Sequence, residues 1–556
     1  MQDDKANVVS LLKAAAERNA DRQAIVMGDG ADSTQRITFG DLWSRVDRVG
    51  AGLSKLGIEQ GDRAVIMIPM SIDLYTLLLA VLKIGAAAVF VDPWISRQQI
   101  ARFAAFSEPK AYFGIGKAHL LRWMDSQLRQ IPLTVTTGNR WGGWAARHSL
   151  EELLSTAGDG RIAGVEGDDS ALITFTTGSS GEPKGANRTH GYLLAQHAAL
   201  QHEFPYHDSD IDLTMFPVFA LNNLAKGIPT IVPEIDFRKV AEADGGALVN
   251  QIAREQVATI TGSPPLIDRM CKALVGSSPP SSLRRILVGG APVSDAQLTF
   301  WQQRLPNVEI VVVYGSTEAE PVAHIPAAER LEIASNPVAS HDGYCVGKPT
   351  DLLQSKVIRI VDSPVQLNEN DWSDWQVPAG EVGELVVTGE HVGRDYFRNP
   401  QAVAANKIVD RHGTIWHRMG DTGYFDHLGR FWLVGRVHST IRRDGVLVHP
   451  QVVEQIAAGD PVEQVAALGI EDAVHDERLV VVASISRATD AAARTIADRL
   501  AKRGVEWDEI ALTEGRLPVD PRHNSKIDYA RLRTELESSR ASRDFVRWKP
   551  KDLRNT

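Results

Sequence analysis

Residues 176–185, TTGSSGEPKG, have the composition of a loop that binds an anion. They follow a short apolar run, residues 171–175, which is typical of a buried strand. Small side chains let backbone N–H groups and hydroxyls converge on one point, and Lys184 adds a mobile positive charge beside it. The stretch is not a P-loop, because Pro183 precedes the lysine and Gly185 follows it. We predict a polyphosphate site, although composition alone leaves open a Ser/Gly-rich surface linker.

Further stretches carry residues that would complete such a site. The segment IVVVYGSTEAEP (310–321) is strand-like and ends in an aromatic, a glycine, two hydroxyls and Glu318, whose carboxylate could hold Mg²⁺. The segment WHRMGDTGYFDHLGRFWLVGR (416–436) places Asp421 at a turn and ends on Arg436. A carboxylate in that position can accept two hydrogen bonds from a ribose diol.

A last stretch, LPVDPRHNSKID (517–528), places Lys526 in a polar turn more than 300 residues from the first loop. Each of these residues also has a purely structural interpretation. Asp421 could be a turn residue, Lys526 a solvated surface lysine and Tyr314 a core aromatic at a strand end. The order of the four stretches along the chain is therefore more informative than any one of them.

The elements that must position these residues follow an alternating pattern. Helical periodicity at 42–57 and 75–84 alternates with buried-strand patterns at 63–70 and 86–93, and similar alternation continues further along the chain. Apolar strands that alternate with helices predict parallel sheets covered on both faces. We therefore expect an α/β fold.

Two changes in the sequence pattern along the chain predict the domain organisation. From about residue 343, short strands are broken by Gly, Asp and Asn, which indicates a small β-rich subdomain at about 343–436. It would complete a large N-terminal domain, residues 1–436, of parallel-rich sheets packed with helices. A compact α+β C-terminal domain, residues 437–556, follows and ends in a charged tail that we expect to be loosely ordered.

Composition excludes several classes of protein. A formal net charge of −10 over 556 residues disfavours a general nucleic-acid binder, which needs clustered Lys and Arg. The only cysteines, Cys271 and Cys345, have no metal-ligand spacing, so we expect no disulfide framework and a reducing cytoplasm. Lys83 and a Gly/Ala cluster interrupt the most apolar stretch, 74–93, which favours a buried helix and strand over a membrane span.

In this order, the stretches FTTGSSGEPKG, YGSTE, GDTGYFDHLGR and GRVHSTIRRDG resemble the core motifs of the adenylate-forming superfamily, which includes acyl-CoA synthetases, luciferases and peptide-synthetase adenylation domains. The resemblance covers about residues 8 to 536. It implies that ATP and Mg²⁺ are used to convert a carboxylate into an acyl-adenylate, with release of pyrophosphate. In that family the C-terminal domain is mobile.

The resemblance also implies a role for each matching residue. The phosphate loop would grip the β- and γ-phosphates with Thr176, Thr177, Gly178, Ser179, Ser180, Gly181 and Lys184. The adenine would be lined by Gly290, Ala291 and Pro292 and stacked on Tyr314. Gly315 and Ser316 belong to the same nucleotide-binding motif, in which Thr317 would meet the α-phosphate and Glu318 would hold Mg²⁺ together with Thr176. Asp421 would bind the ribose hydroxyls with help from Arg436.

Lys526 matches the family's C-terminal lysine, which would bridge the attacking carboxylate and the α-phosphate, because both are anionic. The C-terminal domain would then rotate about a hinge at the position of His438. The family commonly has Asp or Lys there, so His438 could equally be polar surface. We expect His190, His417 and His523 to be structural rather than catalytic bases.

The segment TMFPVFALNNLAKGIPTIVPEID (214–236) resembles the acyl-pocket helix of the family. Peptide-synthetase domains usually have an aspartate there, so amino acid activation is disfavoured. We expect Phe219, Asn222 and Gly315 to contact the acid. The nearby apolar side chains suit an acyl chain, although they could equally be ordinary core.

Several stretches, among them YGSTEAEP, KIVDRHGTIWHRMGDTGYFDHLGRFWLVGR and LPVDPRHNSKID, resemble the β-lactone synthetases of bacterial olefin biosynthesis. In that branch the β-hydroxyl of a 2-alkyl-3-hydroxy fatty acid attacks its own acyl-adenylate and AMP leaves. The region around the hinge and the two asparagines of FALNN depart from this branch. Transfer to CoA or to the phosphopantetheine of a carrier protein is therefore the alternative, and partner enzymes of a lipid or natural-product pathway are implied by either outcome.

Other classes are less well supported. A nucleotide-binding module without catalysis would be free to lose Lys184, Glu318, Asp421 and Lys526, yet all four are present. Nothing in the sequence indicates a luciferase-type oxygenase. The chain contains neither the G-x-S-x-G elbow of a serine hydrolase nor an H-E-x-x-H metal site.

Overall fold

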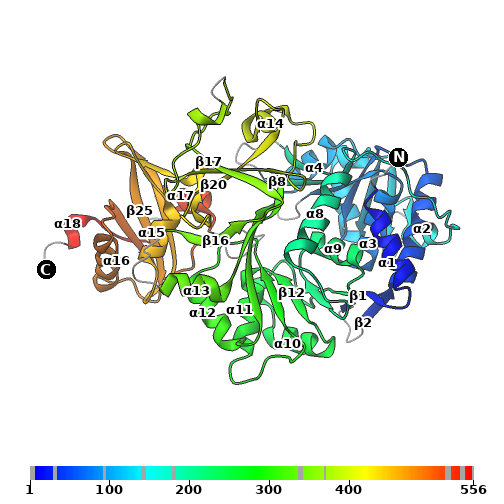
Figure 1. The fold of residues 1–556 in the computed structure, drawn as a ribbon, viewed down its shortest axis with the longest axis horizontal. Coiled ribbons are helices and arrows are strands. Elements are labelled where there is room, and N and C mark those ends of the chain that lie inside the picture. The colour runs from blue at the N-terminus through cyan, green and yellow to red at the C-terminus, as the bar shows by residue number, and fades with distance from the viewer. Residues whose placement is uncertain are drawn as a thin grey trace.

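The computed structural model describes residues 7–28, 34–91, 96–138, 146–177, 183–335, 342–368, 371–519, 527–538 and 545–553, with only the backbone of residues 176 and 177. Within these ranges the chain forms three β-sheets with helices on their faces (Figure 1). Two sheets are formed by residues up to Arg436, and the third by residues beyond it. The α/β fold expected from the alternating pattern is confirmed.

The first sheet is parallel apart from one edge strand. In the described chain it has seven strands, and β9 runs antiparallel to its neighbour β8. The parallel strands are almost entirely buried, which explains their continuous apolar runs. The strands in spatial order are β7 (His148–Ser149), β6 (Leu133–Thr137), β5 (Ala111–Ile115), β3 (Arg63–Met67), β4 (Ala87–Val91), β8 (Ser170–Thr177) and β9 (Pro183–Thr189).

The second sheet joins a parallel half to an antiparallel half. The parallel strands are β1 (Gln23–Gly28), β11 (Thr230–Ile231), β10 (Asp212–Thr214), β12 (Thr259–Gly262), β13 (Arg285–Val288) and β14 (Glu309–Ser316), with β2 (Thr34–Thr38) antiparallel at the edge. Beyond β14 the sheet continues through β15 (Ala319–Pro326), β16 (Tyr344–Pro349), β21 (Phe431–Arg436), β20 (Ile415–Phe425), β18 (Gly383–Gly389) and β17 (Leu353–Ile358), and β19 (Lys407–Val409) pairs with β20. The predicted β-rich segment is therefore continuous with this sheet.

Helices separate and cover the two sheets. Helices α1 (Val9–Arg18), α2 (Phe39–Lys55), α3 (Ile72–Lys83), α7 (Leu150–Leu154), α8 (His190–Glu203) and α9 (Pro217–Lys226) share one large core with both sheets. The outer face of the first sheet is covered by α4 (Arg97–Phe106), α5 (Gly116–Met124) and α6 (Ser126–Arg129). The outer face of the second is covered by α10 (Gly245–Arg254), α11 (Pro264–Ala273), α12 (Asp295–Arg304) and α13 (Ala327–Ser335). Figure 1 shows α1–α3 and α10–α12 on different sides of the molecule.

Two helices begin earlier than the periodicity predicts, because polar residues cap them. The Thr38 hydroxyl accepts a hydrogen bond from the Asp41 N–H, so α2 starts at Phe39. The Ser71 hydroxyl accepts one from the Leu74 N–H, so α3 starts at Ile72. Such caps satisfy backbone donors that the first turn of a helix leaves unpaired.

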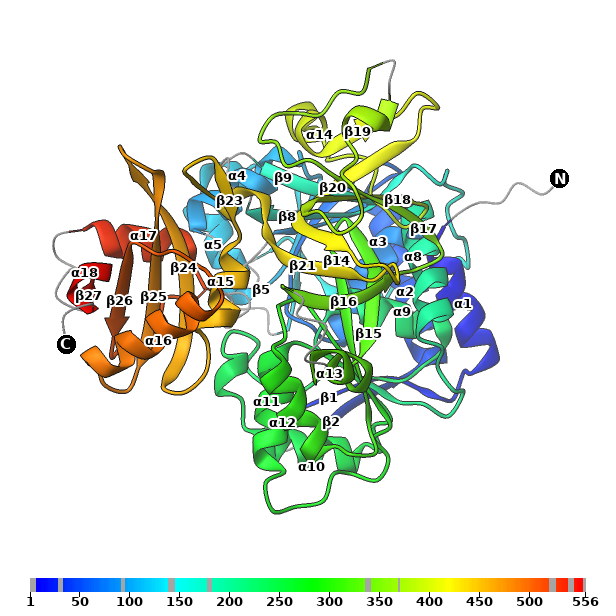
Figure 2. The same ribbon diagram turned by 60° about the vertical axis from the view of Figure 1, so that its left-hand side comes forward.

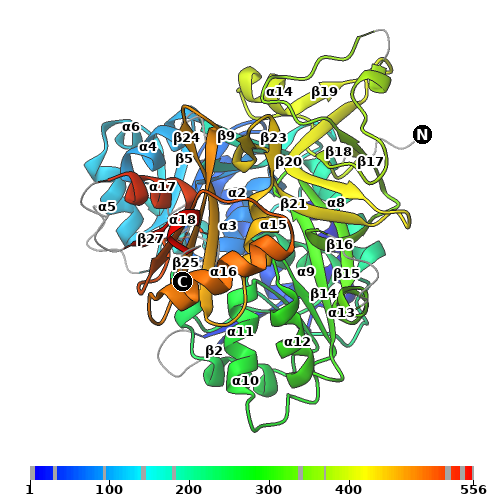
Figure 3. The same ribbon diagram turned by 90° about the vertical axis from the view of Figure 1, so that its left-hand side faces the viewer.

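Beyond Arg436 the chain forms a smaller α+β unit (Figure 2). Its sheet contains β22 (Ile441–Arg443), β23 (Val446–Val448), β24 (Val462–Asp472), β25 (Asp476–Ile485), β26 (Glu509–Thr513) and β27 (Val546–Trp548). Helices α15 (Pro450–Ala457) and α16 (Asp490–Lys502) share one core with the sheet, and α17 (Tyr529–Glu537) shares another (Figure 3).

Part of the charged tail, residues 545–553, forms regular structure. Strand β27 pairs with β26, and the short helix α18 (Pro550–Leu553) follows it. Trp548 is buried, and its indole N–H donates a hydrogen bond to Asp490 over 2.9 Å. Burial of this tryptophan explains why a segment rich in charge is held in place.

Two expectations from composition can be compared with the structure. Cys271 and Cys345 are both buried and free. Among the described residues, no helix is both long and apolar enough to cross a membrane.

Candidate active site

The turn between β14 and β15 holds Glu318 at the centre of a polar cluster. Its carboxylate oxygen Oε1 accepts a hydrogen bond of 2.8 Å from the Tyr396 hydroxyl, and its backbone carbonyl accepts one of 2.7 Å from the Gly393 N–H. The turn is tight at Gly315, where a Cβ atom would lie 2.7 Å from the Ala319 carbonyl oxygen. Glycine is therefore required at position 315.

Two lysines flank the same tyrosine ring. Lys184, on β9, lies with its Nζ 4.8 Å from the centroid of the Tyr396 ring and donates a 3.0 Å hydrogen bond to Asn406 Oδ1. Lys407, on β19, is buried with its Nζ 5.2 Å from the same centroid, and it donates a hydrogen bond to the Gly393 carbonyl. The strands β9 and β19 thus each bring a lysine to the Tyr396 ring.

The pKa values in this cluster reflect burial and the neighbouring charges. Burial lowers the pKa of Lys407 to about 8 and also lowers the pKa of Lys184, with Glu318 opposing both shifts. Burial would raise the pKa of Glu318, but His417, the Tyr396 hydrogen bond and the two lysines together lower it. Burial and Lys407 lower the pKa of His417 to about 3, so this imidazole is neutral near pH 7. Glu318 is therefore an anion there, held mainly by Tyr396 and the lysines.

The end of β9 and the start of α8 hold the other side of the turn. Arg188 Nε and the Tyr192 hydroxyl both donate to the Thr317 carbonyl, over 3.1 and 3.3 Å. One helical turn further on, Gln196 Nε2 donates to the Glu320 carbonyl over 3.2 Å. The backbone carbonyls of Thr317 and Glu320 are thus held by side chains from β9 and α8.

A second carboxylate, that of Asp421, lies on β20, and Arg436 lies opposite it on β21. Asp421 is buried, and its Oδ2 accepts a 2.6 Å hydrogen bond from the Tyr314 hydroxyl. Arg436 Nε lies 2.8 Å from Asp421 Oδ1, and the two residues are paired across the strands. The charge of Asp421 raises the pKa of Arg436, whose own side chain is half exposed. The Tyr314 ring packs against Phe431, with centroids 6.1 Å apart.

The predicted adenine segment lies next to these residues. Gly290, Ala291 and Pro292 follow β13, whose neighbour β14 carries Tyr314 at its carboxyl end. Gly290 has a φ of 81°, in the left-handed region that favours glycine. Loops at the carboxyl ends of parallel strands are where open α/β sheets bind ligands.

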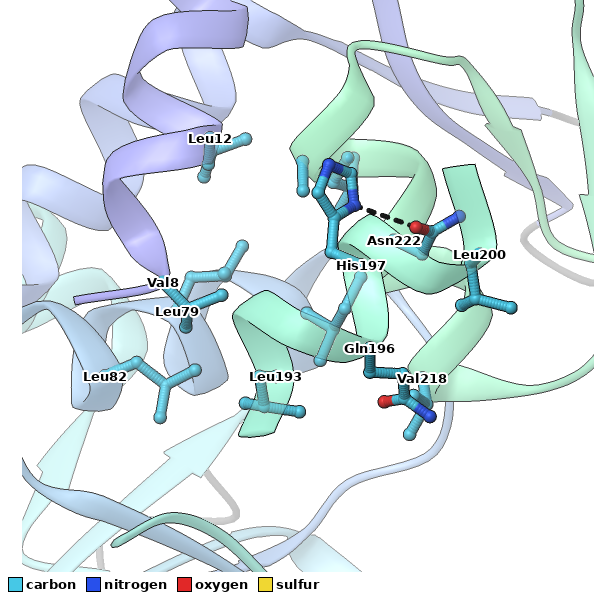
Figure 4. Close-up of a pocket in the computed structure, with 13 residues that line it drawn as sticks. Val8, Leu12, Leu79, Leu82, Leu193, Gln196, His197, Leu200, Val218 and Asn222 are labelled. Atoms are coloured by element: carbon cyan, nitrogen blue, oxygen red, sulfur yellow. Dashed lines mark hydrogen bonds between the residues drawn. The ribbon is translucent and has the colours of Figure 1, made fainter. Parts of the chain in front are cut away.

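The three residues expected to contact the acid have different neighbours in the structure. Phe219 is buried beside Phe216 in a cluster that includes β13 and β14 residues. Asn222 lies nearly one turn further along α9, where its Oδ1 accepts hydrogen bonds from His197 Nδ1 at 2.8 Å (Figure 4) and Gln201 Nε2 at 3.3 Å. Gly315 is in the β14–β15 turn. Helix α9 therefore presents Phe219 and Asn222 to different surroundings.

Some of the remaining predicted residues belong to stretches outside the part of the chain that the structure describes. Gly178, Ser179, Ser180, Gly181, Lys526 and His523 lie outside the described residues, as do the side chains of Thr176 and Thr177. His438 is exposed, and desolvation by the surrounding chain together with Arg436 lowers its pKa. His190 is buried and its Nδ1 accepts the Val8 N–H over 3.2 Å, which agrees with the structural role expected of it.

Sequence reasoning missed several residues of this site: Arg188, Tyr192, Gln196, Tyr396, Asn406 and Lys407. One of them had a usable signal. Lys184 and Arg188 are four residues apart, and in β9 (Pro183–Thr189) a period of two places them on the same face. Tyr396 and Lys407 had no comparable signal in the sequence. Only the tertiary fold brings β19 and the segment that precedes it close to the turn that holds Glu318.

The arrangement can stabilise a polyanion beside a fixed carboxylate. Lys184, Arg188 and Lys407 supply positive charge, and Glu318 supplies an anionic oxygen ligand. Among the described residues, no group of three or more His, Cys, Asp or Glu side chains could hold a metal ion. A Mg²⁺ ion held by one or two carboxylates and substrate phosphates, its usual mode with nucleotides, fits this donor set.

The fold and the site define an adenylate-forming enzyme. Residues 12–397 match the family model described as AMP-binding enzyme, and the chain belongs to this family. Members activate an acid by adenylation, so the chain is an adenylate-forming ligase that binds ATP and a carboxylic acid.

Two olefin β-lactone synthetases are similar to this chain over most of its length. The chain is 33% identical over 513 residues to an olefin β-lactone synthetase of Stenotrophomonas maltophilia, with 89% of this chain and 90% of the relative covered. It is 31% identical over 550 residues to an olefin β-lactone synthetase of Xanthomonas campestris, with 95% and 96% covered.

Solved structures agree in fold. The amide bond synthetase McbA from Marinactinospora thermotolerans superposes with a TM-score of 0.77 at 21% identity, covering 95% of this chain and 99% of that one. The Bacillus subtilis o-succinylbenzoate CoA synthetase with its acyl-adenylate intermediate has a TM-score of 0.74 at 19% identity, covering 95% and 98%. At these identities the likeness supports the fold alone.

Proposed function

We propose that this enzyme converts a 2-alkyl-3-hydroxy fatty acid into a β-lactone at the expense of ATP. The observation that carries the proposal is the full-length similarity to two olefin β-lactone synthetases, at 33% and 31% identity. A 4-coumarate–CoA ligase of Arabidopsis thaliana covers 88% of the chain at only 25% identity, so transfer to a thiol is the weaker alternative.

The reaction has two steps. A carboxylate oxygen of the acid attacks the α-phosphorus of ATP, and pyrophosphate leaves to give the acyl-adenylate. The 3-hydroxyl oxygen then attacks the activated carbonyl carbon, its proton passes to a base or solvent, and AMP leaves with the carboxyl oxygen bound to phosphorus. An internal nucleophile gains from proximity, which offsets part of the strain of the four-membered ring.

The residues of the site have roles in the first step. We assign Lys184 and Arg188 to the phosphates, Glu318 to Mg²⁺, and Asp421 with Arg436 to the ribose hydroxyls. Bound Mg²⁺ would neutralise charge on the phosphates. Lys526 would join when the C-terminal unit closes on the site, with His438 at the hinge.

Product analysis by mass spectrometry tests the proposal. The enzyme is incubated with Mg-ATP and a long-chain 2-alkyl-3-hydroxy acid, with and without CoA, while AMP is followed. A product lighter than the acid by one water, formed without CoA, is the expected result. An acyl-AMP that persists until CoA or a carrier protein is added, and then becomes a thioester, would overturn the lactone step and leave adenylation intact.

A further inference from the structure

Helix α5 presents an apolar face to the outside of the molecule. Leu120, Trp123 and Met124 are 53%, 45% and 63% exposed in the described part of the chain. Their spacing of three and four residues places them on one side of the helix. The other side is buried through His119 and Arg122, and His119 Nε2 lies 3.0 Å from a backbone carbonyl oxygen of β6. A single exposed apolar side chain is ordinary, but a group of large ones marks an interaction surface.

This face lies on the outer side of the first sheet, away from the candidate active site. Helix α5 contacts β5 and β6, and α6 contacts α4 and α5; Figure 3 shows the three helices at the left-hand edge of the molecule. In the sheet, β3, β4 and β8 separate β5 from β9, the strand that carries Lys184. At about 4.8 Å for each strand spacing, β5 lies roughly 20 Å from β9. A partner bound to α5 therefore occupies a different surface from the adenylation site.

The region around α5 is positively charged in a chain that is negative overall. Residues 97–129 contain six Lys and Arg residues and two acidic residues, whereas the formal net charge of the whole chain is −10. Both acidic side chains are engaged. Glu108 forms an ion pair with Arg398, and Asp125 accepts hydrogen bonds from two backbone N–H groups at the start of α6. The exposed charge of this region is therefore mainly positive.

Exposed basic side chains accompany the apolar residues. Lys117 lies one turn before Leu120 on the same side of α5, and Arg129 lies on α6. The guanidinium of Arg122 lies 5.1 Å from the centroid of the Trp123 ring, so a positive charge also lies next to the indole. The exposed basic residues of the region are Arg97, Arg102, Lys117, Arg129 and Arg147.

These features together fit a lipid bilayer with anionic headgroups. A helix with large apolar side chains on its outward face and Lys and Arg beside them lies in the plane of a membrane surface. Tryptophan is favoured at that depth, because its ring is apolar and its N–H is polar. The basic side chains are attracted by the negative surface potential of anionic lipids. A second copy of the chain is a poorer occupant, because a two-fold contact would place the same positive charges against each other.

We infer that a patch on α5 and α6 docks this protein reversibly on bilayers that contain anionic lipid. The α5 patch consists of Lys117, Leu120, Trp123, Met124 and Arg129. Docking goes beyond the proposed function and does not depend on it, because it requires neither ATP nor the acid. It is reversible, since one short helix inserts few side chains and the net charge of −10 opposes approach to an anionic surface.

Vesicle flotation tests the inference with the full-length protein, without ATP or acid. The vesicles consist of phosphatidylcholine alone, or of phosphatidylcholine and phosphatidylglycerol in equal amounts. The apolar variant combines Leu120→Gln, Trp123→Gln and Met124→Gln, and the charge variant combines Lys117→Glu with Arg129→Glu. All five side chains are exposed, so these variants should fold. Circular dichroism and thermal melting establish that they do.

Matched controls change similar residues elsewhere on the surface. Leu428→Gln with Val474→Gln replaces apolar side chains that are 51% and 78% exposed. Lys55→Glu with Lys502→Glu reverses two charges on exposed lysines of α2 and α16. Both controls should float as wild type does, because neither changes the α5 patch.

We expect wild type to float with the mixed vesicles and much less with phosphatidylcholine alone. Each Lys or Arg near an anionic surface contributes about fivefold in affinity, so the charge variant should bind at least about twentyfold more weakly. The apolar variant should bind at least about tenfold more weakly, because three large side chains no longer enter the bilayer. High salt should weaken flotation of wild type.

Two results would overturn the inference: wild type that does not float with the mixed vesicles, or equal flotation by wild type and both patch variants. Light scattering covers the other occupant. A dimer of wild type that the apolar variant does not form, without flotation of either, would assign the face to a second copy of the chain.

Pyrophosphate release separates this inference from the proposed function. With a detergent-dispersed acid, wild type and both patch variants should release pyrophosphate equally, because no residue of the α5 patch is assigned to the active site. If wild type releases none with any acid, the proposed function fails, and the flotation result still decides whether the α5 patch binds a bilayer.

Discussion

Asp421 is held by a tyrosine and an arginine, so its replacement affects both stability and ATP use. Asp421→Ala leaves the Tyr314 hydroxyl buried without its acceptor, which costs about 1–3 kcal/mol. We also expect KM for ATP to rise at least about tenfold, because hydrogen bonds to a charged carboxylate are lost. Tyr314→Phe is the comparison, since it removes the same hydrogen bond but keeps the carboxylate. Thermal melting and pyrophosphate release measure the two effects, and equal KM for ATP in both variants would contradict the ribose assignment.

Lys526 is predicted to neutralise charge as the carboxylate attacks the α-phosphate. Lys526→Ala should therefore lose most adenylation, about a hundredfold or more, because preorganised charge is one of the largest contributions to catalysis. Lys549→Ala is the control, since Lys549 is an exposed lysine of the same unit. The measurement is pyrophosphate release at saturating ATP and acid. Near wild-type release in Lys526→Ala would remove this residue from the mechanism.

At the scale of elements, α8 connects the phosphate strand to the motif around Glu318. It begins directly after β9, and the Thr189 hydroxyl caps it by accepting the Tyr192 N–H over 3.1 Å. Thr189→Ala should cost about 1 kcal/mol of unfolding free energy, and Thr189→Ser should restore most of it. Because Tyr192 also holds the Thr317 carbonyl, we expect kcat to fall in Thr189→Ala. Chemical denaturation and kinetics check this; an unchanged stability would show that the cap is not needed.

The local sequence pattern predicted the helices and strands well, but it predicted the tertiary contacts between them poorly. Strands such as β3 and β4 were evident from apolar runs, and helices from their period, because burial on known faces sets these patterns. The approach of Tyr396 and Lys407 to Glu318 depends on how β19 packs on the second sheet, which no local pattern encodes. Asn222 was predicted from its neighbours in the sequence, but the direction in which it faces is set by the packing of α9.

At the scale of the whole molecule, two buried histidines make stability depend on pH. Burial lowers the pKa of His190 to about 4, and burial and Lys407 lower that of His417 to about 3. In the unfolded chain both would titrate near 6.5. The unfolded state therefore binds protons first as the pH falls, and stability is lost from about pH 6.5 down to about pH 4 for His190 and about pH 3 for His417.

The loss from His190 is about 2 kcal/mol at pH 5. His190→Asn should remove this part of the pH dependence, because an amide oxygen can still accept the Val8 N–H. Urea denaturation at pH 7 and pH 5 compares the two proteins. The same decrease in both would show that His190 does not contribute.

The unit beyond Arg436 contacts the rest of the molecule partly through exposed ion pairs. Arg503 lies 2.6 Å from Asp342, and Arg442 lies 2.8 Å from Asp362. Such pairs contribute little to stability, so they can be broken and re-formed at low cost. This property favours the closure on the site that we propose for this unit.

The last strand has a consequence for how the protein can be shortened. Strand β27 is the terminal strand of the smaller sheet, where it covers the hydrogen-bonding edge of β26 and buries Trp548. A chain that stops at residue 538 would present that edge, with its unpaired N–H and C=O groups, as a template for other molecules. Such a truncation removes no residue assigned to the active site. Its main effect would therefore be to promote self-association rather than to lower catalysis.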